Sequence, residues 1–340
     1  MKRTRRTARL LCALLIALLG VAGRAGAQPS VTILFTGDVM LGRSLEAAAR
    51  AANDPLFAFR RVADMLQSAD LTVGNLECVL SDLGAPAHKA YALRCAEGLE
   101  ALRWAGFDVL SLANNHAMDF GEGALLDMIN RLRVAGIATV GAGENLSAAR
   151  LPAVLLSNGV RIAFLGYVNV PQDGAPFYFR NDLTAATATQ AGVAWANADP
   201  EGVAMIEEDV RAAKALADVV IVLLHAGTEY TRTPNAVQRT LAYAAIESGA
   251  AAVIGAHPHV LQGVQRYKGG IIAYSLGNFA FDMAVDTSAA LRLSVTADGV
   301  QGYEWLPIVI GNYGQPRPAT PEQAARIHAA LERLTTQLNR

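Results

Sequence analysis

Six short apolar runs in the sequence each end in a small group of Asp, Asn, Glu, Gly or His residues. The runs are continuous and rich in Val, Ile and Leu, a pattern typical of strands buried on both faces of a sheet. They cover residues 31–35, 71–73, 107–112, 219–224, 251–254 and 271–274. Because parallel α/β sheets bind ligands beyond the carboxyl ends of their strands, we expect the polar residues after these runs to meet at one edge. That edge is the predicted active site.

Segments with apolar residues at helical spacing lie between these runs. They are residues 54–66, 98–104, 122–134, 201–217 and 235–248. The recurring order of strand, loop, helix and strand predicts α/β layers. Residues 173–199 mix Pro, Gly, Asn and Thr without a strong period and predict an inserted loop over one end of the sheet. From residue 289 the pattern predicts two further strands, at 291–296 and 302–310, and a last amphipathic helix at 321–338.

The first 27 residues predict an export signal rather than a part of the fold. Five basic residues precede an apolar stretch at 10–22, and Ala25-Gly26-Ala27 fits the small-residue rule for signal cleavage. We therefore expect cleavage after Ala27 and an exported chain, either periplasmic or extracellular. The apolar stretch is short for a bilayer span, and a retained membrane anchor is the alternative.

Composition narrows the class of protein. Of the 340 residues, 52% are apolar and 17% are charged, and the formal net charge is -1. A chain of this kind buries a substantial core. It lacks the basic excess of nucleic-acid-binding proteins, so we expect no nucleic-acid partner. We expect one main domain at 28–288, which residues 289–340 complete.

Cys78 and Cys95 remain after the predicted cleavage. In an oxidising exported setting they are able to pair, and because Cys78 directly follows Glu77, a bridge would brace the loop that carries a candidate ligand. Two buried free thiols are the alternative, since spacing alone cannot fix disulfide geometry.

The polar residues after the apolar runs are oxygen and imidazole donors suited to a divalent metal. The set comprises Asp38, Glu77, Asn115, His225, His257 and His259. Such donors suit Mn, Fe or Zn, and we expect one or two ions. In His257-Pro258-His259, the rigid proline projects two imidazoles in different directions, as two neighbouring metal sites require. A metal pair would clamp a phosphoryl oxygen and generate a nucleophile for in-line attack.

Further polar residues have both a functional and a structural interpretation. His116, next to Asn115, is placed to protonate a leaving group, because imidazole titrates near neutral pH. Arg43 either holds an anionic substrate or forms an ion pair that braces its loop. Glu229 either contacts substrate or supports a ligand, with capping or packing as the alternative. Asn278 either orients a ligand loop or is a turn residue.

Six motifs carry this chemistry. They lie at residues 37–43 (GDVMLGR), 74–77 (GNLE), 114–119 (NNHAMD), 225–230 (HAGTEY), 255–260 (GAHPHV) and 275–279 (SLGNF). In order and spacing, over about residues 31–281, they resemble the motifs of the CapA family, the poly-gamma-glutamate capsule biosynthesis proteins. The resemblance implies an α/β fold similar to that of calcineurin-like metallophosphoesterases, with two packed mixed β-sheets flanked by helices. It also implies a role in the synthesis or export of a cell-surface polyglutamate.

Two positions depart from the pattern of true metallophosphoesterases. Their first motif supplies a His two residues after the Asp, where this chain has Met40. The Asp that bridges two metals in their second motif matches Asn75, which is neutral. Glu77 is then the possible substitute for that bridge. Asn75 itself is expected to support the ligands without binding metal. The general acid His116 matches, as does the remaining ligand set, which consists of Asn115, His225 and His257. One metal site is therefore better supported than two.

The sequence leaves two functions open. In the first, the chain is a metal-dependent hydrolase that acts on a phosphoester or on the amide bonds of polyglutamate. In the second, it is a binding or scaffold protein, whose site edge holds the anionic extracellular polymer or docks to a membrane synthase complex without turnover. Met40 and Asn75 favour the second function, while an intact His116 favours the first.

Overall fold

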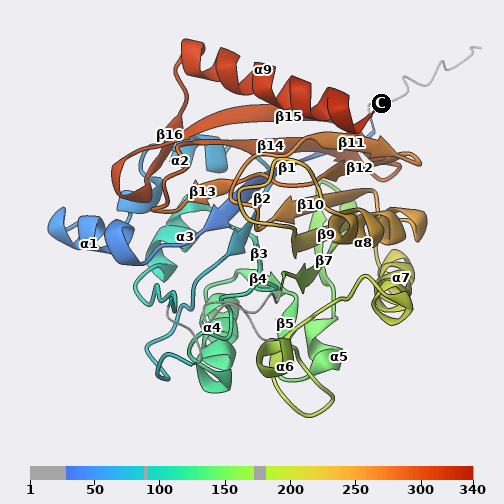
Figure 1. Ribbon diagram of the computed structural model, residues 1–340, viewed down its shortest axis with the longest axis horizontal. Helices are drawn as coiled ribbons and strands as arrows, with labels where there is room; N and C mark the ends of the chain where they lie inside the picture. The colour runs from blue at the N-terminus through green and yellow to red at the C-terminus, as the bar shows by residue number, and fades with distance from the viewer. Residues whose placement is uncertain (1–27, 88–90, 172–180, 340) are drawn as a thin grey trace, which may run out of the picture.

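The computed structural model describes residues 28–87, 91–171 and 181–339 (Figure 1). The predicted signal peptide at 1–27 lies outside the described residues. None of the helices within them combines the length and the apolar character that a bilayer span requires.

Two mixed β-sheets pack face to face. In the described residues the first sheet has eight strands, in the order β16-β15-β14-β1-β2-β3-β4 with β13 beside β1. Their bounds are β1 Val31–Val39, β2 Leu71–Leu76, β3 Val109–Ser111, β4 Ala138–Val140, β13 Asn278–Ala280, β14 Thr287–Thr296, β15 Gly299–Ile310 and β16 Pro316–Pro318. Strands β1 to β4 are parallel to one another, whereas β14 runs antiparallel to β1.

The second sheet has six strands within the described ranges, in the order β11-β12-β10-β9-β7-β6. Their bounds are β6 Ala153–Ser157, β7 Val160–Asn169, β9 Val219–Ala226, β10 Ala252–Ala256, β11 Val264–Tyr267 and β12 Gly270–Ala273. Strands β7, β9, β10 and β12 are parallel, and the two outer strands are antiparallel. A separate short pair joins β5 Ala142–Gly143 to β8 Gly192–Val193.

Alternation along each strand sorts the apolar side chains into separate cores. On β9, Val219, Ile221 and Leu223 face the core between the two sheets, while the residues between them face the helices. On β1, Ile33 faces the inter-sheet core and Leu34 faces the outer one. Because both faces are covered, the strands consist of continuous apolar residues, as the sequence predicted.

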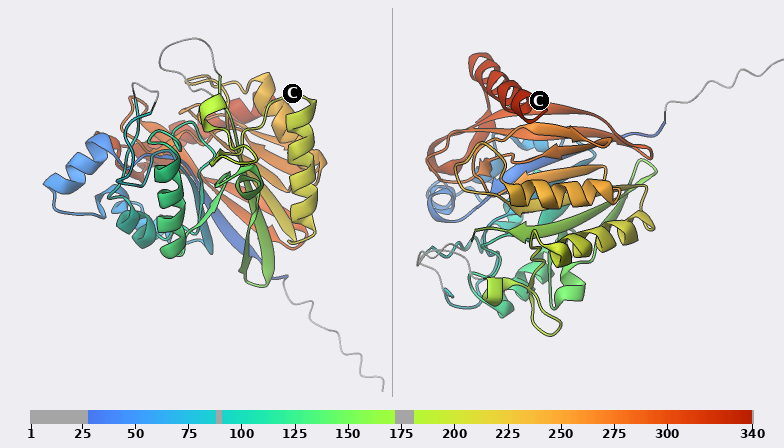
Figure 2. Two further views of the ribbon diagram at one scale, coloured as in Figure 1. Left: turned by 90° about the horizontal axis from the view of Figure 1, so that it is seen from below. Right: turned by 45° about the vertical axis from the view of Figure 1, so that its right-hand side comes forward.

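Helices cover the outer faces of both sheets. The first sheet is covered by α1 Arg43–Ala51, η1 Phe57–Phe59, α2 Ala63–Leu66, α3 Leu99–Ala105 and α4 Glu122–Val134. The second is covered by α7 Pro200–Lys214 and α8 Ala236–Glu247, which lie side by side (Figure 2). Local sequence fixes their ends: the Asp199 side chain accepts from the Gly202 amide at the start of α7, and a capping box of Asn235 and Gln238 starts α8.

The C-terminal residues belong to the first sheet and close one side of the sandwich. β14 pairs with β1, β15 and β16 extend the sheet, and η2 Asn312–Gly314 links the last two strands. Helix α9, Pro321–Leu338, runs along β15 and contacts β11 of the other sheet (Figure 1). Its buried Ile327 and Leu331 join the inter-sheet core.

Two segments differ from the helical and loop patterns that the sequence suggested. Residues 54–66 do not form one helix: Asp54 accepts a hydrogen bond from the amide of Leu56 and binds Arg60, and Val62 leaves helical geometry at φ -127°. The segment is therefore a short 3-10 turn followed by α2. In the predicted loop, residues 172–180 lie outside the described residues, and the rest contains α6 Asn181–Thr184 and β8. The remaining short helix is α5 Leu146–Ala149.

Candidate metal centre

The carboxyl ends of strands from both sheets meet at one place, and the polar residues gather there. Asp38 lies at the end of β1, Glu77 directly follows β2, and His225 lies near the end of β9. His257 and His259 follow β10. All five side chains are buried. The structure thus brings these candidates to a common edge, which both sheets contribute.

Two groups of possible metal donors share one residue, Glu77. One group consists of Asp38, Glu77 and His259, and the other of Glu77, His225 and His257. In each group the donor atoms lie within 4.8 Å of one another. Glu77 would therefore be available to an ion in either group.

The carboxylate of Glu77 carries the strongest indication that a cation belongs here. Both of its oxygens are buried and accept no hydrogen bond within the described residues. Burial raises the pKa of Glu77 well above its ordinary value, and the nearby charge of Asp38 raises it further. A buried carboxylate without hydrogen bonds is costly unless it takes up a proton, which its raised pKa favours, or a cation compensates for its charge. The donor set therefore fits a divalent metal.

Distances around Glu77 are too long for hydrogen bonds but suit a shared ion. Its Oε1 lies 3.9 Å from Nε2 of His225 and 3.9 Å from Nε2 of His259. Two ligand atoms that are each about 2.1 Å from one ion lie at most about 4.2 Å apart. Each of the two spacings is within the range that two ligands of one ion can have, with His225 in one donor group and His259 in the other.

Asn278 sets the orientation of His259. The Oδ1 atom of Asn278 lies 2.7 Å from Nδ1 of His259, and because an amide oxygen only accepts, Nδ1 carries the hydrogen. Nε2 is then directed at Glu77. Burial by itself would lower the pKa of His259, but the charges of Glu77 and Asp38 raise it to about 9. Without another cation, a proton on His259 therefore offsets part of the carboxylate charge.

Asn75 connects donors of the two groups without belonging to either. Its Nδ2 donates to Oδ1 of Asp38 at 2.8 Å and lies 3.2 Å from Nδ1 of His225. Asn114, a residue that sequence reasoning missed, donates to Oδ1 of Asn75 at 3.2 Å and to the carbonyl of Leu76 at 2.8 Å. These two side-chain amides therefore hold Asp38 and His225 in position through hydrogen bonds. The only sequence signal for Asn114 was its position directly before Asn115.

Asn115 and the loop after β10 complete the arrangement. Oδ1 of Asn115 lies 2.8 Å from Nε2 of His225, a separation that fits either a hydrogen bond or two ligands of one ion. The amide of His257 donates to Oδ2 of Asp38 at 3.3 Å. His257 and His259 both have positive φ, 95° and 57°, which costs backbone energy. Such strain is typical of functional sites.

His116 lies at the edge of the cluster and is the more exposed of its imidazoles. Its side chain is 14% exposed, compared with 1% for His225 and 5% for His259. Nδ1 of His116 lies 2.6 Å from Oδ2 of Asp119, and Nε2 lies 4.0 Å from Oε1 of Glu77. Asp119 is a second residue that sequence reasoning missed. Its spacing of three residues from His116 was the available signal.

The remaining candidates occupy different positions. Arg43 forms an ion pair with Asp282, which also accepts from the amide of Ser44, so its contacts are those of the loop-bracing alternative. Glu229 lies with His257 and His259 in a third group of possible donors. Met40 is buried in the core, and its sulfur accepts from the amide of Gly42 at 3.2 Å. No imidazole occupies that position of the first motif.

A disulfide joins Cys78 to Cys95, with Cα atoms 5.8 Å apart. The bridge starts at the residue after Glu77, and backbone hydrogen bonds from Val79 to Leu93 and from Cys95 to Val79 pair the two segments beside it. It therefore holds the Glu77 loop against the segment that leads to α3. The sequence was compatible with either a disulfide or two free thiols, and in the structure the two cysteines form the disulfide.

Two packed sheets of this topology, with a carboxylate and histidine cluster at the ends of their parallel strands, define a metallophosphoesterase-like α/β sandwich. A solved structure with a similar fold is that of a hypothetical protein from Thermus thermophilus, with a TM-score of 0.52 and 17% identity over 82% of this chain and 99% of that chain. The family model described as bacterial capsule synthesis protein PGA_cap matches residues 32–283, and the chain belongs to this family.

Curated relatives agree with the family assignment. The chain is 36% identical to the capsule biosynthesis protein CapA of Bacillus anthracis over 299 residues, which cover 85% of this chain and 70% of that protein. It is 35% identical to the PGA biosynthesis protein CapA of Bacillus subtilis (strain 168) over 285 residues, 81% of this chain and 70% of that protein. A probable polyglutamine synthesis accessory protein of Mycobacterium tuberculosis is 28% identical over 298 residues, 76% of each chain.

Removal of the disulfide should lower the free energy of unfolding. The two cysteines are 17 residues apart, and closing a loop of this size stabilises a chain by about 3 kcal/mol in the chain-entropy account. Denaturant unfolding with and without reductant measures the loss. The Cys78→Ala/Cys95→Ala variant is the control, since reductant should leave its stability unchanged. Two freely alkylated thiols in non-reduced protein, detected by mass spectrometry, would contradict the bridge.

Proposed function

We propose that this protein is an exported, metal-dependent hydrolase of capsule or polyglutamate biosynthesis. The observation that carries the proposal is the buried carboxylate of Glu77, whose two oxygens accept no hydrogen bond in the described part of the chain. Three imidazoles lie within 4.0 Å of it. A site of this composition is built for cations rather than for apolar ligands.

The proposed ligands are the two donor groups that share Glu77, with Asn115 beside His225. Mn, Fe or Zn suits this mixture of carboxylate, amide and imidazole donors. A divalent ion of this kind polarises phosphoryl or carbonyl oxygens. The protein itself contributes orientation, because Asn75 and Asn278 each fix the position of a donor side chain.

His116 is proposed as the proton donor. Its hydrogen bond with Asp119 holds the ring, and the carboxylate of Asp119 is itself fixed by the amide of Leu93 at 2.7 Å. Nδ1 then carries a hydrogen, and Nε2 is directed toward the cluster. Since His116 is the imidazole with partial exposure, it is able to exchange its proton with water between turnovers.

The proposed substrate is an anionic polymer of linked glutamates, with a phosphoester as the alternative. Relatives are named for capsule, PGA or polyglutamine synthesis, which supports a polymer of this kind and a role beside a membrane synthase complex. Export is supported by the signal-like residues 1–27 and by the disulfide, because such bonds persist in oxidising compartments.

A specific observation favours a second function, a scaffold that binds polymer or synthase without turnover. Met40 is a core side chain where metallophosphoesterases have a histidine, and Asn75 is neutral where they have a bridging aspartate. Met40 removes an imidazole donor, and Asn75 removes a negative charge, from the part of the cluster around Asp38. Under this alternative, the cluster would hold an ion for structure or for polymer carboxylates alone.

Metal binding should depend on His257. Purified protein should contain one to two divalent ions per chain by elemental analysis, and an ion at a hundred times its Kd should stabilise the fold by about 2.7 kcal/mol. His257→Ala should lose most of the metal and the thermal shift that Mn²⁺ produces. His328→Ala is the matched control, because His328 is exposed on α9 and should keep both. Wild-type protein without metal, and without a shift on adding Mn, Zn or Fe, would contradict the proposal.

Loss of the proton donor should affect turnover but not metal content. His116→Ala should lower kcat on an aryl phosphodiester or a γ-linked glutamate oligomer by about a hundredfold or more, since a positioned acid contributes at least that much. Its metal content should stay near wild type, unlike that of His257→Ala. Equal metal loss in both variants would make His116 a ligand. Normal polymer formation in cells that express either variant would instead favour the scaffold function.

A further inference from the structure

A groove of about 450 Å³ runs beside α9. This helix closes one side of the sandwich (Figure 1). It is bounded by α9, the loop after β9, and the adjoining ends of β14 and β15. Its lining residues on the helix extend from Gln323 to Gln337, a stripe of about 21 Å at the helical rise of 1.5 Å per residue. The groove therefore extends along most of the helix.

The groove is apolar at its base and cationic at its rim. Leu261 and Ile327 are buried side chains at the base. Three arginines line the rim, Arg232, Arg326 and Arg333, against one acidic residue, Asp286. Within the described ranges, none of these guanidinium groups forms an ion pair or a hydrogen bond. The positive charge is local, because the whole chain has a net charge of -1.

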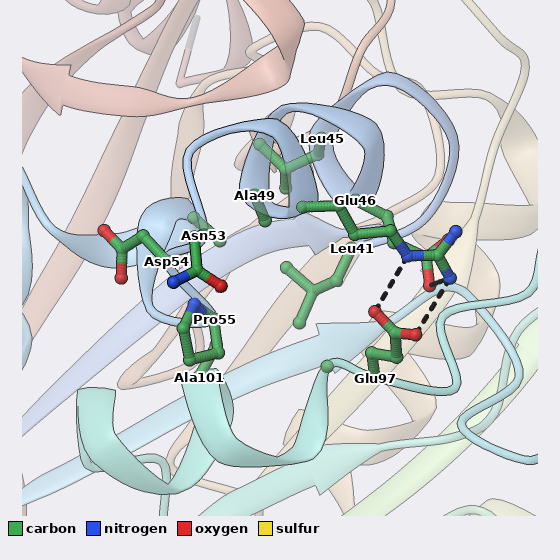
Figure 3. A pocket seen from close by; sticks show the side chains of 12 residues that line it. Leu41, Leu45, Glu46, Ala49, Asn53, Asp54, Pro55, Glu97 and Ala101 are labelled. Carbon is green, nitrogen blue, oxygen red and sulfur yellow. Dashed lines mark hydrogen bonds and ion pairs between the residues drawn. The ribbon is translucent and has the colours of Figure 1, made fainter.

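A second pocket shows that this arrangement is not general in the protein. The pocket between α1 and α3, about 190 Å³, is also lined by an arginine, Arg50. Glu46 and Glu97 are labelled among its lining residues in Figure 3. There Arg50 binds Glu46 at 3.0 Å and Glu97 at 2.9 Å, so its charge is already neutralised. In the α9 groove, a hydrogen bond from its own amide lowers the pKa of Glu322 and the charge of Arg326 lowers it further, but these two side chains form no ion pair. Unlike Arg50, the groove arginines therefore have no ion-pair partner within the described residues.

One short loop contributes a residue to the groove and another to a donor group of the metal centre. Arg232 lies three residues after Glu229, which belongs to a donor group with His257 and His259. Between them, the amide of Tyr230 donates to the carbonyl of Pro258 at 2.8 Å, and the loop is thereby fixed to the turn between the two histidines. The same loop therefore connects the groove lining to the donor cluster along the chain.

We propose that this groove binds a linear polycarboxylate, a segment of γ-linked glutamates. The inference rests on the proposed function. The methylene groups of such a chain match the apolar base, and its carboxylates match guanidinium groups, which bind carboxylates in a bidentate manner. Arg326 and Arg333, seven residues apart on one helix face, lie about 10 Å from each other along the axis and would contact separate units.

Binding of a fluorescent γ-linked glutamate decamer, measured by anisotropy at 50 mM and 200 mM NaCl, tests the proposal. Arg326→Gln/Arg333→Gln should weaken the affinity about tenfold and reduce its salt dependence. The matched control is Arg61→Gln/Arg103→Gln, which removes the same charge from exposed positions whose guanidinium groups also form no ion pair within the described residues. Its affinity should stay within twofold of wild type.

The outcomes separate this inference from the function on which it rests. Equal affinity in the groove and control variants would overturn it, as would tighter binding of polyphosphate than of the decamer. If His257→Ala abolishes decamer binding while the groove variant retains it, the polymer binds at the cluster alone, and the groove proposal fails although the proposed function stands. Weakened binding in the groove variant, with metal content unchanged, supports the groove.

Discussion

The arrangement depends on one costly feature, the burial of the Glu77 carboxylate where the two sheets meet. Burial and the neighbouring Asp38 raise its pKa, and its oxygens accept no hydrogen bond in the described residues. A protein keeps such a group only where something compensates for its charge. Two surrounding features position the groups involved. The disulfide holds the loop of Glu77, and Asn278 directs His259 toward Glu77.

Glu77 also explains how the site accommodates its departures from the metallophosphoesterase pattern. Where those enzymes have a bridging aspartate, Asn75 donates to Asp38 and lies beside His225. Glu77, two residues along the chain, belongs to both donor groups. Met40 remains a core residue, so the first group relies on two carboxylates and one imidazole. Two neighbouring donor groups are therefore retained, whereas the sequence by itself supported one site better.

Much of the fold was predictable from the sequence, because strands covered on both faces need continuous apolar runs and the ends of parallel strands converge. The strands that carry Asp38, His225 and His257 were located in this way. Contacts between distant segments were not predictable: Arg43 binds Asp282, 239 residues further along the chain. The α9 groove was also not predictable, because Arg232 and the two arginines of α9 are brought together only by the packing of the C-terminal helix. Residues 54–66 had helical spacing, yet local Asp54 contacts break the helix.

Anomalous diffraction from crystals grown with Mn²⁺ tests the central claim most directly. We predict anomalous density next to the Glu77 carboxylate, within reach of His225 and His257, of His259 and Asp38, or of both groups. We also predict that Glu77 keeps its buried position when the ion is bound. Anomalous density elsewhere on the chain only, or a Glu77 side chain turned away from the cluster with the site free of Mn²⁺, would contradict the central role of this carboxylate.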